Sequence, residues 1–205
     1  MDAATLARCT GARLERAQLL AGAITAAMAD YDISTPQRQG MFLPNVGVET
    51  MGLKFLAELG SRDYLMRYEG RLDLGNTQAG DGPRFKGRGL LQTTGRANYR
   101  ALTQRLRARG IQCPDFEAEP EKLELPDWAA LSAADYVGMR NLNAKADAGD
   151  FLGYCIGVNG RNKDTGLPNG WRERTDLWVA ARKALVIDDT HAAGADSMWG
   201  NEIRR

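Results

Sequence analysis

Apolar residues recur at helical spacing along much of the chain. Between residues 12 and 30 one helical face carries Leu14, Ala17, Leu20, Ala21, Ile24 and Met28. Thr35 followed by Pro36 is typical of a helix start, because proline is tolerated at the first helical position. Further helices are predicted at residues 96–109, 127–142, 147–158 and 171–186. The pattern predicts a mainly helical protein.

A second apolar series contains a carboxylic acid. Its apolar members are Phe42, Val46, Leu53 and Leu56. Glu49 falls in the gap of this series, on the same face, where apolar neighbours would keep its carboxyl group protonated. A helix-end glutamate paired with an arginine explains the spacing equally well. Pro44 lies inside the stretch, so we expect it to kink the helix or mark a second start.

The middle of the chain is rich in glycine and predicts irregular structure. Residues 60–89 contain seven glycines, and loops of this length in a compact domain are usually functional. Residues 85–99 then combine three glycines with cationic and hydrogen-bonding side chains. Glycines let a backbone approach a ligand closely, and neutral amides and hydroxyls suit sugar hydroxyl and acetamide groups. We therefore expect a glycan-binding segment here.

Composition excludes several classes of function. The net charge of +1 over 205 residues creates no strong field for nucleic acid. No apolar run reaches the roughly 18 residues of a membrane span, and residues 17–29 continue as an amphipathic helix, so we expect no signal peptide. Without repeats or linkers, the chain 1–205 is predicted to form one domain with a core at about 12–186 and a frayed tail at 187–205.

Cysteine and histidine usage argues against metal and nucleophilic chemistry. Cys9, Cys113 and Cys155 are widely spaced and form no CxxC pair, which predicts free thiols in a reducing compartment. The single histidine, His191, lies in a predicted loop near the end of the chain. We expect no metal, no cofactor and no catalytic pair built on histidine.

Carboxylates remain as the candidate catalytic groups. Glycosidic bonds are cleaved by two carboxyl groups, one acting as acid and the other as base or nucleophile. Glu49 is the candidate acid, and Glu58 and Glu69 compete for the second role. In one continuous helix Glu58 would lie about 180° from Glu49, so the helix must end or bend between them. Asp73 is a weaker candidate, and Asp81 is predicted to serve a turn.

These residues resemble glycoside hydrolase family 19, which comprises plant-type chitinases and phage endolysins, and most closely its phage and bacterial branch. Residues 85–99 resemble the family motif (Y/F)xGRG(P/L)(I/L)Q(L/I)(T/S)xxxNY, and residues 68–82 resemble the run YEGRxDLGN followed by GDG. The resemblance covers roughly residues 12–186. It implies a mainly α, lysozyme-like bilobed domain with a substrate cleft and an irregular Gly-rich loop region.

The resemblance also implies roles for individual residues. Residues 42–50 resemble FLAQ(V/I)(G/A)HE(S/T), which places the general acid on Glu49. Glu58 resembles the glutamate that ends the acid's helix in phage members, and we prefer it to Glu69 as the base. Thr94 falls where the family helps to hold the attacking water. The residues expected to bind the sugar are Gln92, Asn98, Tyr99, Asn159 and Arg174, with internal hydrogen bonding as the alternative role for the first four.

Three departures from the family pattern bear on the site. Val48 stands in place of the histidine before the acid, Pro44 in place of an alanine, and Arg161 in place of the second glycine of the NGG loop. Val48 removes a polar neighbour of the acid. Arg88 is expected to pin a carboxylate within the fold instead of binding substrate.

Together these features predict an endolysin-type peptidoglycan hydrolase, a muramidase. It is expected to cleave the β-1,4 bond between N-acetylmuramic acid and N-acetylglucosamine by an inverting mechanism. Its expected partner is the peptidoglycan glycan strand, and we expect a monomer. By analogy with the family, the protein would wait in the host cytoplasm until a holin opens the membrane, and then act on the wall in the periplasm. The alternatives are a chitinase, a lytic transglycosylase and a non-catalytic cell-wall-binding module.

Overall fold

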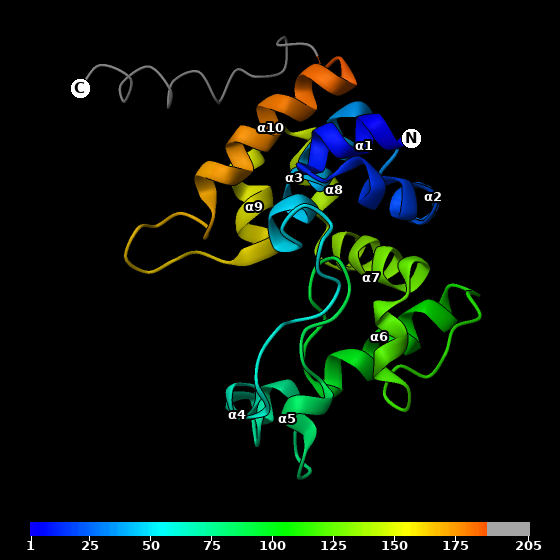
Figure 1. Ribbon diagram of the computed structural model, residues 1–205, viewed down its shortest axis with the longest axis vertical. Helices are drawn as coiled ribbons and strands as arrows, with labels where there is room; N and C mark the ends of the chain where they lie inside the picture. The colour runs from blue at the N-terminus through cyan, green and yellow to red at the C-terminus, as the bar shows by residue number, and fades with distance from the viewer. Residues whose placement is uncertain (188–205) are drawn as a thin grey trace.

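The computed structural model describes residues 1–187, which form helices joined by irregular segments (Figure 1). The α-helices in this range are α1 (Ala3–Thr10), α2 (Leu14–Asp30), α3 (Pro36–Glu49), α4 (Arg62–Leu65), α5 (Asp81–Arg84), α6 (Arg96–Ala108), α7 (Pro126–Met139), α8 (Leu142–Asp147), α9 (Phe151–Asn159) and α10 (Trp171–Leu185). The 3₁₀ helices are η1 (Met66–Tyr68), η2 (Leu72–Leu74) and η3 (Pro120–Glu124). The predicted mainly α class is confirmed; His191 and nearly all of the predicted frayed tail lie outside the described residues.

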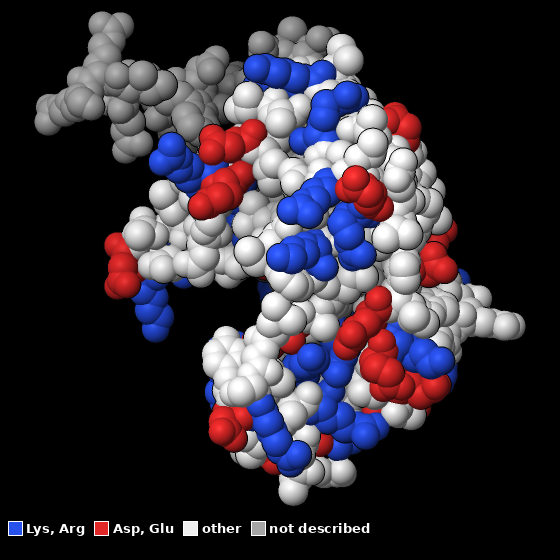
Figure 2. Space-filling view, viewed as in Figure 1, with Lys and Arg blue, Asp and Glu red and all other residues white. Residues whose placement is uncertain are grey.

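The helices are arranged in two lobes. Helices α1, α2, α3, α8, α9 and α10 form the larger lobe, α4, α5 and α6 form the smaller one, and α7 lies between them (Figure 1). The segment after α3 leads into the smaller lobe, and the 85–95 loop, which connects α5 to α6, lies against it where Gly89 N donates to Leu56 O at 2.8 Å. The space-filling view shows a hollow between the lobes, bounded by α9 and the loop 160–170 on one side and by α4 on the other (Figure 2).

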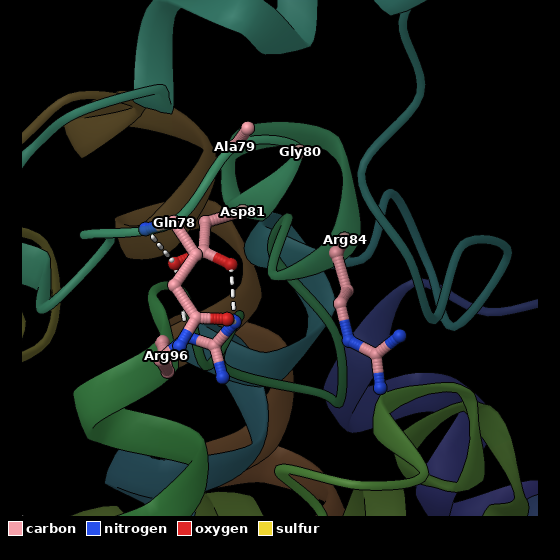
Figure 3. A pocket seen from close by; sticks show the side chains of 6 residues that line it. All are labelled: Gln78, Ala79, Gly80, Asp81, Arg84 and Arg96. Atoms are coloured by element: carbon pink, nitrogen blue, oxygen red, sulfur yellow. Dashed lines mark hydrogen bonds and ion pairs between the residues drawn. The ribbon is translucent and has the colours of Figure 1, made fainter.

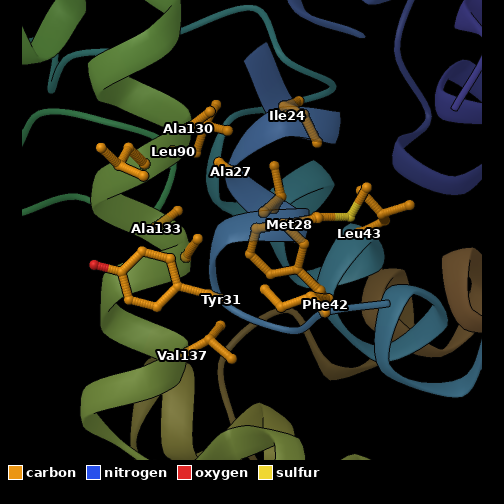
Figure 4. Packing of buried hydrophobic residues seen from close by; sticks show 14 of the residues in the cluster. Ile24, Ala27, Met28, Tyr31, Phe42, Leu43, Leu90, Ala130, Ala133 and Val137 are labelled. Atoms are coloured by element: carbon orange, nitrogen blue, oxygen red, sulfur yellow. The ribbon is translucent and has the colours of Figure 1, made fainter. Parts of the chain in front are cut away.

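The core of the larger lobe is built by α2, which packs against α7 and lies close to α3. Ile24 and Met28 project from α2 toward Ala133 of α7, and Phe42 of α3 closes the cluster (Figure 4). These four side chains are at most 2% exposed. Burial of each large apolar side chain contributes about 1.5–3 kcal/mol, so this layer fixes α3 relative to the rest of the lobe.

Helix α3 places the candidate acid at its C-terminal end. It begins where Thr35 Oγ1 accepts from Arg38 N at 3.2 Å, with Pro36 at the first position as predicted. It runs without interruption through Pro44, so there is no second start there. It ends at Glu49, because residues 51–53 all adopt positive φ and turn the chain away.

Several predicted boundaries need correction. Helix α1 was not predicted, since it is only eight residues long; Asp2 caps it by accepting from Thr5 N at 2.8 Å. The predicted helix 127–142 ends at Met139. The predicted helix 147–158 corresponds to α9, which begins later, at Phe151, because Asp150 caps it by accepting from Gly153 N at 2.8 Å. The apolar series that contains Glu49 likewise continues past the helix into a turn.

All three cysteines are free thiols in the structure. Cys9 and Cys155 are buried, and burial raises their pKa values to about 11 and about 12 respectively. Cys113 is partly buried, and burial raises its pKa as well. The two buried thiols therefore act as small packing groups in the larger lobe.

The smaller lobe is held by a cluster of ion pairs at the start of α6. Arg96 Nη2 lies 2.5 Å from Asp81 Oδ1, and Arg96 Nη1 lies 3.0 Å from Glu117 Oε1. Arg100 Nε approaches Glu117 Oε2 at 2.6 Å. Hydrogen bonds from Arg100 and Arg96 lower the pKa of Glu117 to about 2. This cluster ties α5 and α6 to the segment before η3.

Acid should weaken this cluster. The folded pKa of Glu117 lies below its unfolded value of about 4.5, so its contribution is present above pH 4.5 and is lost as the pH falls toward about 2. We expect Glu117→Gln to lower the free energy of unfolding near neutral pH by on the order of 1 kcal/mol, since solvent screens a side chain that is 22% exposed.

Urea unfolding of both proteins between about pH 7 and pH 2.5 measures the effect. The gap between wild type and variant should close as the pH falls. A gap that stays constant at every pH would show that Glu117 does not contribute through its charge.

Candidate active site

The candidate acid lies in a closed ring of polar side chains. Glu49 Oε1 accepts from Arg174 Nη2, in the first turn of α10, and from Asn159 Nδ2, at the end of α9, at 3.2 Å. Arg174 Nε donates to Asn169 O at 3.0 Å, and Asn169 N donates to Asn159 Oδ1 at 3.0 Å. Three helices and the loop 160–170 therefore meet at one carboxylate.

Arg174 is anchored inside the fold. Its side chain is 1% exposed, and its Nη1 donates to Asn45 Oδ1 at 2.6 Å. Asn45 is itself fully buried on α3, four residues before Glu49, and its Nδ2 donates to Met41 O at 2.8 Å. Because a buried guanidinium must keep its hydrogen bonds, this arrangement fixes the position of Glu49.

These partners correct one prediction about Glu49. The sequence placed it among apolar neighbours, but the structure gives it the alternative weighed for the same spacing, a helix-end glutamate paired with an arginine. The side chain is 19% exposed. Both donors engage Oε1, and Oε2 has no hydrogen-bond partner among residues 1–187. One oxygen is thus held and the other is left open.

The second candidate carboxylate, Glu58, is fixed by three donors. Oε1 accepts from Arg67 Nη2 at 2.5 Å and from Tyr68 Oη at 3.1 Å, while Oε2 accepts from Gly87 N at 3.2 Å. Its backbone N also donates to Gly87 O at 2.8 Å. The side chain is 15% exposed. The resemblance implied that Glu58 ends the helix of the acid. It does not, because α3 ends nine residues earlier.

Gly87 brings Glu58 and Thr94 together. Isolated β-bridges pair Arg88 with Ala57 and with Thr93, so the segment before α4 and the two arms of the 85–95 loop lie side by side. A Cβ atom on Gly87 would lie 2.5 Å from Gln92 Oε1 and 3.2 Å from Thr94 Oγ1. A side chain at position 87 would have to displace the Gln92 side chain, and the N–H of Gly87 points at Glu58. The loop therefore sets the candidate base beside a hydroxyl.

Gln92 and Asn98 have their amide nitrogens engaged inside this loop. Gln92 Nε2 donates to Gly89 O at 3.0 Å, and Asn98 Nδ2 donates to Thr94 O at 2.7 Å. Their side-chain oxygens accept no hydrogen bond from any residue in the described range 1–187. Asn98 is exposed and Gln92 half-buried, so both acceptors remain available to a ligand.

Tyr99 lies inside the fold instead of on the surface of the site. It is fully buried, and its hydroxyl donates to Lys86 O at 2.6 Å and accepts from Arg88 Nη1 at 3.1 Å. Burial raises the pKa of its hydroxyl. Arg88 also donates from Nε to Glu124 Oε1 at 2.7 Å, which matches the prediction that it pins a carboxylate. A sugar does not reach Tyr99 in this position, so its role is to hold the loop.

The rival carboxylates are engaged in shaping the smaller lobe. Glu69 accepts from Gly80 N at 2.6 Å and from Gly82 N at 2.7 Å, one bond on each oxygen. Asp73 pairs with Arg71 on the surface. Asp81 is 1% exposed and is bound by Arg96 and by Gln78 N, as expected for a turn residue.

A separate pocket lies beside Asp81, and neither Glu49 nor Glu58 lines it. It is lined by Gln78, Ala79, Gly80, Asp81, Arg84 and Arg96 (Figure 3). Its charged groups are already engaged, since Arg96 pairs with Asp81 and Arg84 Nη2 donates to Ala118 O at 2.8 Å. The pocket is therefore part of the ion-pair cluster that holds this lobe.

Residues 1–187 contain no group of three or more histidine, cysteine or acidic side chains arranged to hold a metal ion. No helix in the same range is long and apolar enough to cross a membrane.

Solved structures of known proteins share this architecture. Chitinase C from Streptomyces griseus HUT6037 matches with a TM-score of 0.70 and 22% identity, over 89% of this chain and 75% of that one. The chain has the fold of the family 19 chitinases. A bacterial family 19 chitinase matches with a TM-score of 0.69 and 23% identity, over 90% of this chain and 94% of that one. No family model matches the chain. The family 19 fold predicted from the 85–99 motif is thus confirmed, and the endolysin branch stays a prediction.

The sequence named Asn159 and Arg174 as sugar-binding residues, whereas the structure places both on Glu49, and it missed the other side chains that hold the two carboxylates. Asn45 and Asn169 act through Arg174, and Arg67 and Tyr68 act on Glu58. Tyr68 was part of the motif run, but Arg67 gave no signal, because it stands outside every family motif. Its role depends on a contact with Glu58, nine residues earlier in the chain.

Replacing the Tyr99 hydroxyl tests its internal role. We expect Tyr99→Phe to lower the free energy of unfolding by about 1–3 kcal/mol, because Lys86 O and one Arg88 donor lose a buried partner. The KM for a glycan substrate should stay within about twofold of wild type. Urea unfolding and steady-state kinetics check both numbers; a large rise in KM with unchanged stability would restore direct sugar contact.

Proposed function

We propose that this protein is a glycoside hydrolase that cleaves the β-1,4 bond between N-acetylmuramic acid and N-acetylglucosamine in peptidoglycan, with inversion. The observation that carries the proposal is the pair of carboxylates at the ends of two separate supports, Glu49 on the larger lobe and Glu58 where the chain enters the smaller one. The space-filling view shows a hollow between the two lobes (Figure 2).

Glu49 is suited to donate the proton. Arg174 and Asn159 both engage Oε1, so a proton on this carboxyl group resides on Oε2, which has no partner among residues 1–187. In the proposed reaction Oε2 protonates the leaving glycosidic oxygen. After cleavage Arg174 stabilises the carboxylate that remains, because the same guanidinium is already in contact with it.

Glu58 is suited to activate water. Its two oxygens are held by Arg67, Tyr68 and Gly87, an arrangement that suits a carboxylate acting as base. Thr94 Oγ1 lies close to Gly87, whose N–H binds Glu58, and would help to orient the water. An inverting pair lies about 6.5–9.5 Å apart, which leaves room for that water. Gln92, Asn98 and Asn159 would bind hydroxyl and acetamide groups.

Three alternatives differ from the proposal in substrate, in chemistry or in lacking catalysis. A chitinase is favoured by the similar solved structures, which are chitinases. A lytic transglycosylase needs one glutamate and forms an anhydro product, so the firmly held second carboxylate argues against it. Endolysin function with holin-dependent release from a host cytoplasm rests on the resemblance of residues 85–99 to phage and bacterial members. A non-catalytic wall-binding module would not need either carboxylate.

Isosteric substitution of the carboxylates tests the mechanism. We expect Glu49→Gln and Glu58→Gln each to lower kcat on purified peptidoglycan by about 10²–10⁴-fold, because each removes a proton transfer. Glu69→Gln is the matched control; it should keep most of the activity and instead lower the melting temperature, since Glu69 binds two backbone amides. Release of reducing ends measures activity. Activity that survives Glu49→Gln would refute the mechanism, and loss at Glu69 alone would move the base to that residue.

The products identify the bond and the stereochemistry. We expect new reducing ends on N-acetylmuramic acid, initially as the α-anomer by NMR, and no anhydro sugar by mass spectrometry. Turnover of soluble N-acetylglucosamine oligomers should be slower than turnover of peptidoglycan strands. Faster cleavage of the oligomers would identify a chitinase, and an anhydro product would identify a transglycosylase.

A further inference from the structure

The guanidinium that binds Glu58 contacts two aromatic rings. Arg67 Cζ lies 3.9 Å from the centroid of the Tyr64 ring and 4.7 Å from that of the Tyr68 ring. Tyr64 comes from α4, whereas Arg67 and Tyr68 belong to η1. These two cation–π contacts restrict the position of the guanidinium, a restraint that a flexible surface arginine lacks.

This guanidinium has donors to spare. The hydrogen bonds that Arg67 makes within residues 1–187 both leave from Nη2, to Glu58 Oε1 at 2.5 Å and to Tyr68 Oη at 2.7 Å. Its Nε and Nη1 bond to no described residue, and the side chain is 45% exposed. An arginine presents five N–H groups in a rigid fork that matches a carboxylate. The open edge is thus a preformed anion-binding group.

Its surroundings keep the positive charge available. Glu58 is the single carboxylate within residues 1–187 that pairs with Arg67, and Lys86 Nζ lies close by, donating to Glu58 O at 3.1 Å. Asp63, on α4, is exposed and forms no ion pair among the described residues. Two cations therefore flank one carboxylate at the edge of the candidate site.

We propose that the open edge of Arg67 binds a carboxylate of the glycan substrate and so selects acidic strands over neutral ones. This inference rests on the proposed function, and it names the chemical group, a carboxylate, that distinguishes peptidoglycan strands from N-acetylglucosamine polymers. N-acetylmuramic acid carries a lactyl carboxyl group and its peptide stem carries others, whereas N-acetylglucosamine polymers carry none. The contacts with the Tyr64 and Tyr68 rings restrict the direction of the fork, and contact with Glu58 sets its distance from the reacting bond.

Binding measured without turnover tests this directly. The Glu49→Gln protein serves as a non-cleaving background, and calorimetry gives Kd for three matched ligands. These are glycan strands freed of peptide by an amidase, the same strands after methyl esterification of their carboxylates, and strands with intact stems. The free strands carry lactyl carboxylates and the intact ones carry stem carboxylates, so the three arms also show which source is bound.

We expect the Glu49→Gln protein to bind at least one acidic ligand about tenfold more tightly than the esterified strands, as for one charge-assisted contact. Adding Arg67→Gln should reduce that ratio to about one, and Arg67→Lys should restore only part of it, since lysine lacks the fork. Arg71→Gln, which removes another exposed arginine of this lobe, is the matched control and should leave the ratio unchanged. Equal affinity for acidic and esterified strands would overturn the inference.

Measurements of turnover distinguish failure of the Arg67 inference from failure of the proposed function. In the active enzyme, Arg67→Gln should lower kcat/KM on acidic strands about tenfold more than on N-acetylglucosamine oligomers. An equal loss on both would show that Arg67 acts through Glu58 alone and would overturn substrate contact. A protein that cleaves neither substrate but keeps the binding preference would refute the proposed hydrolase and leave the carboxylate site in place.

Discussion

The contact between Arg174 and Glu49 governs the arrangement of the larger lobe. A guanidinium that is 1% exposed costs free energy unless each donor finds an acceptor, and here the acceptors come from α3 and from the loop before α10. The helices must therefore approach one another in one specific way. Gly47 makes this possible, because a Cβ there would lie 2.3 Å from Thr10 O and force α1 away from α3.

In the smaller lobe, backbone groups take the place of the buried ion pair in fixing the position of the candidate carboxylate. Gly87 binds Glu58 through both its N–H and its carbonyl, and the Arg88 bridges align that strand with the loop that carries Thr94. Held by Gly87 N together with Arg67 and Tyr68, the Glu58 carboxylate has little freedom to reorient. Each candidate catalytic group is thus positioned within its own lobe, and the relative placement of the lobes alone sets the gap between them.

Much of this could be predicted where the sequence carries a local signal. The 85–99 motif identified the fold and the loop that holds Thr94, and the glycine-rich stretch marked the irregular region. Glu49 was found, and pairing with an arginine at a helix end was one of its two predicted surroundings. Periodicity did not decide between the two, because it does not reveal that residues 51–53 end the helix with positive φ. Tyr99 looked like a ligand contact and is buried, since a motif does not show which way a side chain points. Asn45 and Arg67 were missed because their roles arise from contacts between segments distant or irregular in the chain.

The buried thiols have a consequence for where such a molecule can work. A thiol with a pKa of about 11 or 12 has less than about one part in a thousand as reactive thiolate near neutral pH. Cys9 and Cys155 are also enclosed by the helices of the larger lobe, away from oxidants. The architecture therefore needs neither a reducing nor an oxidising milieu to persist, and passage from one to the other would leave its covalent structure unchanged at both buried positions.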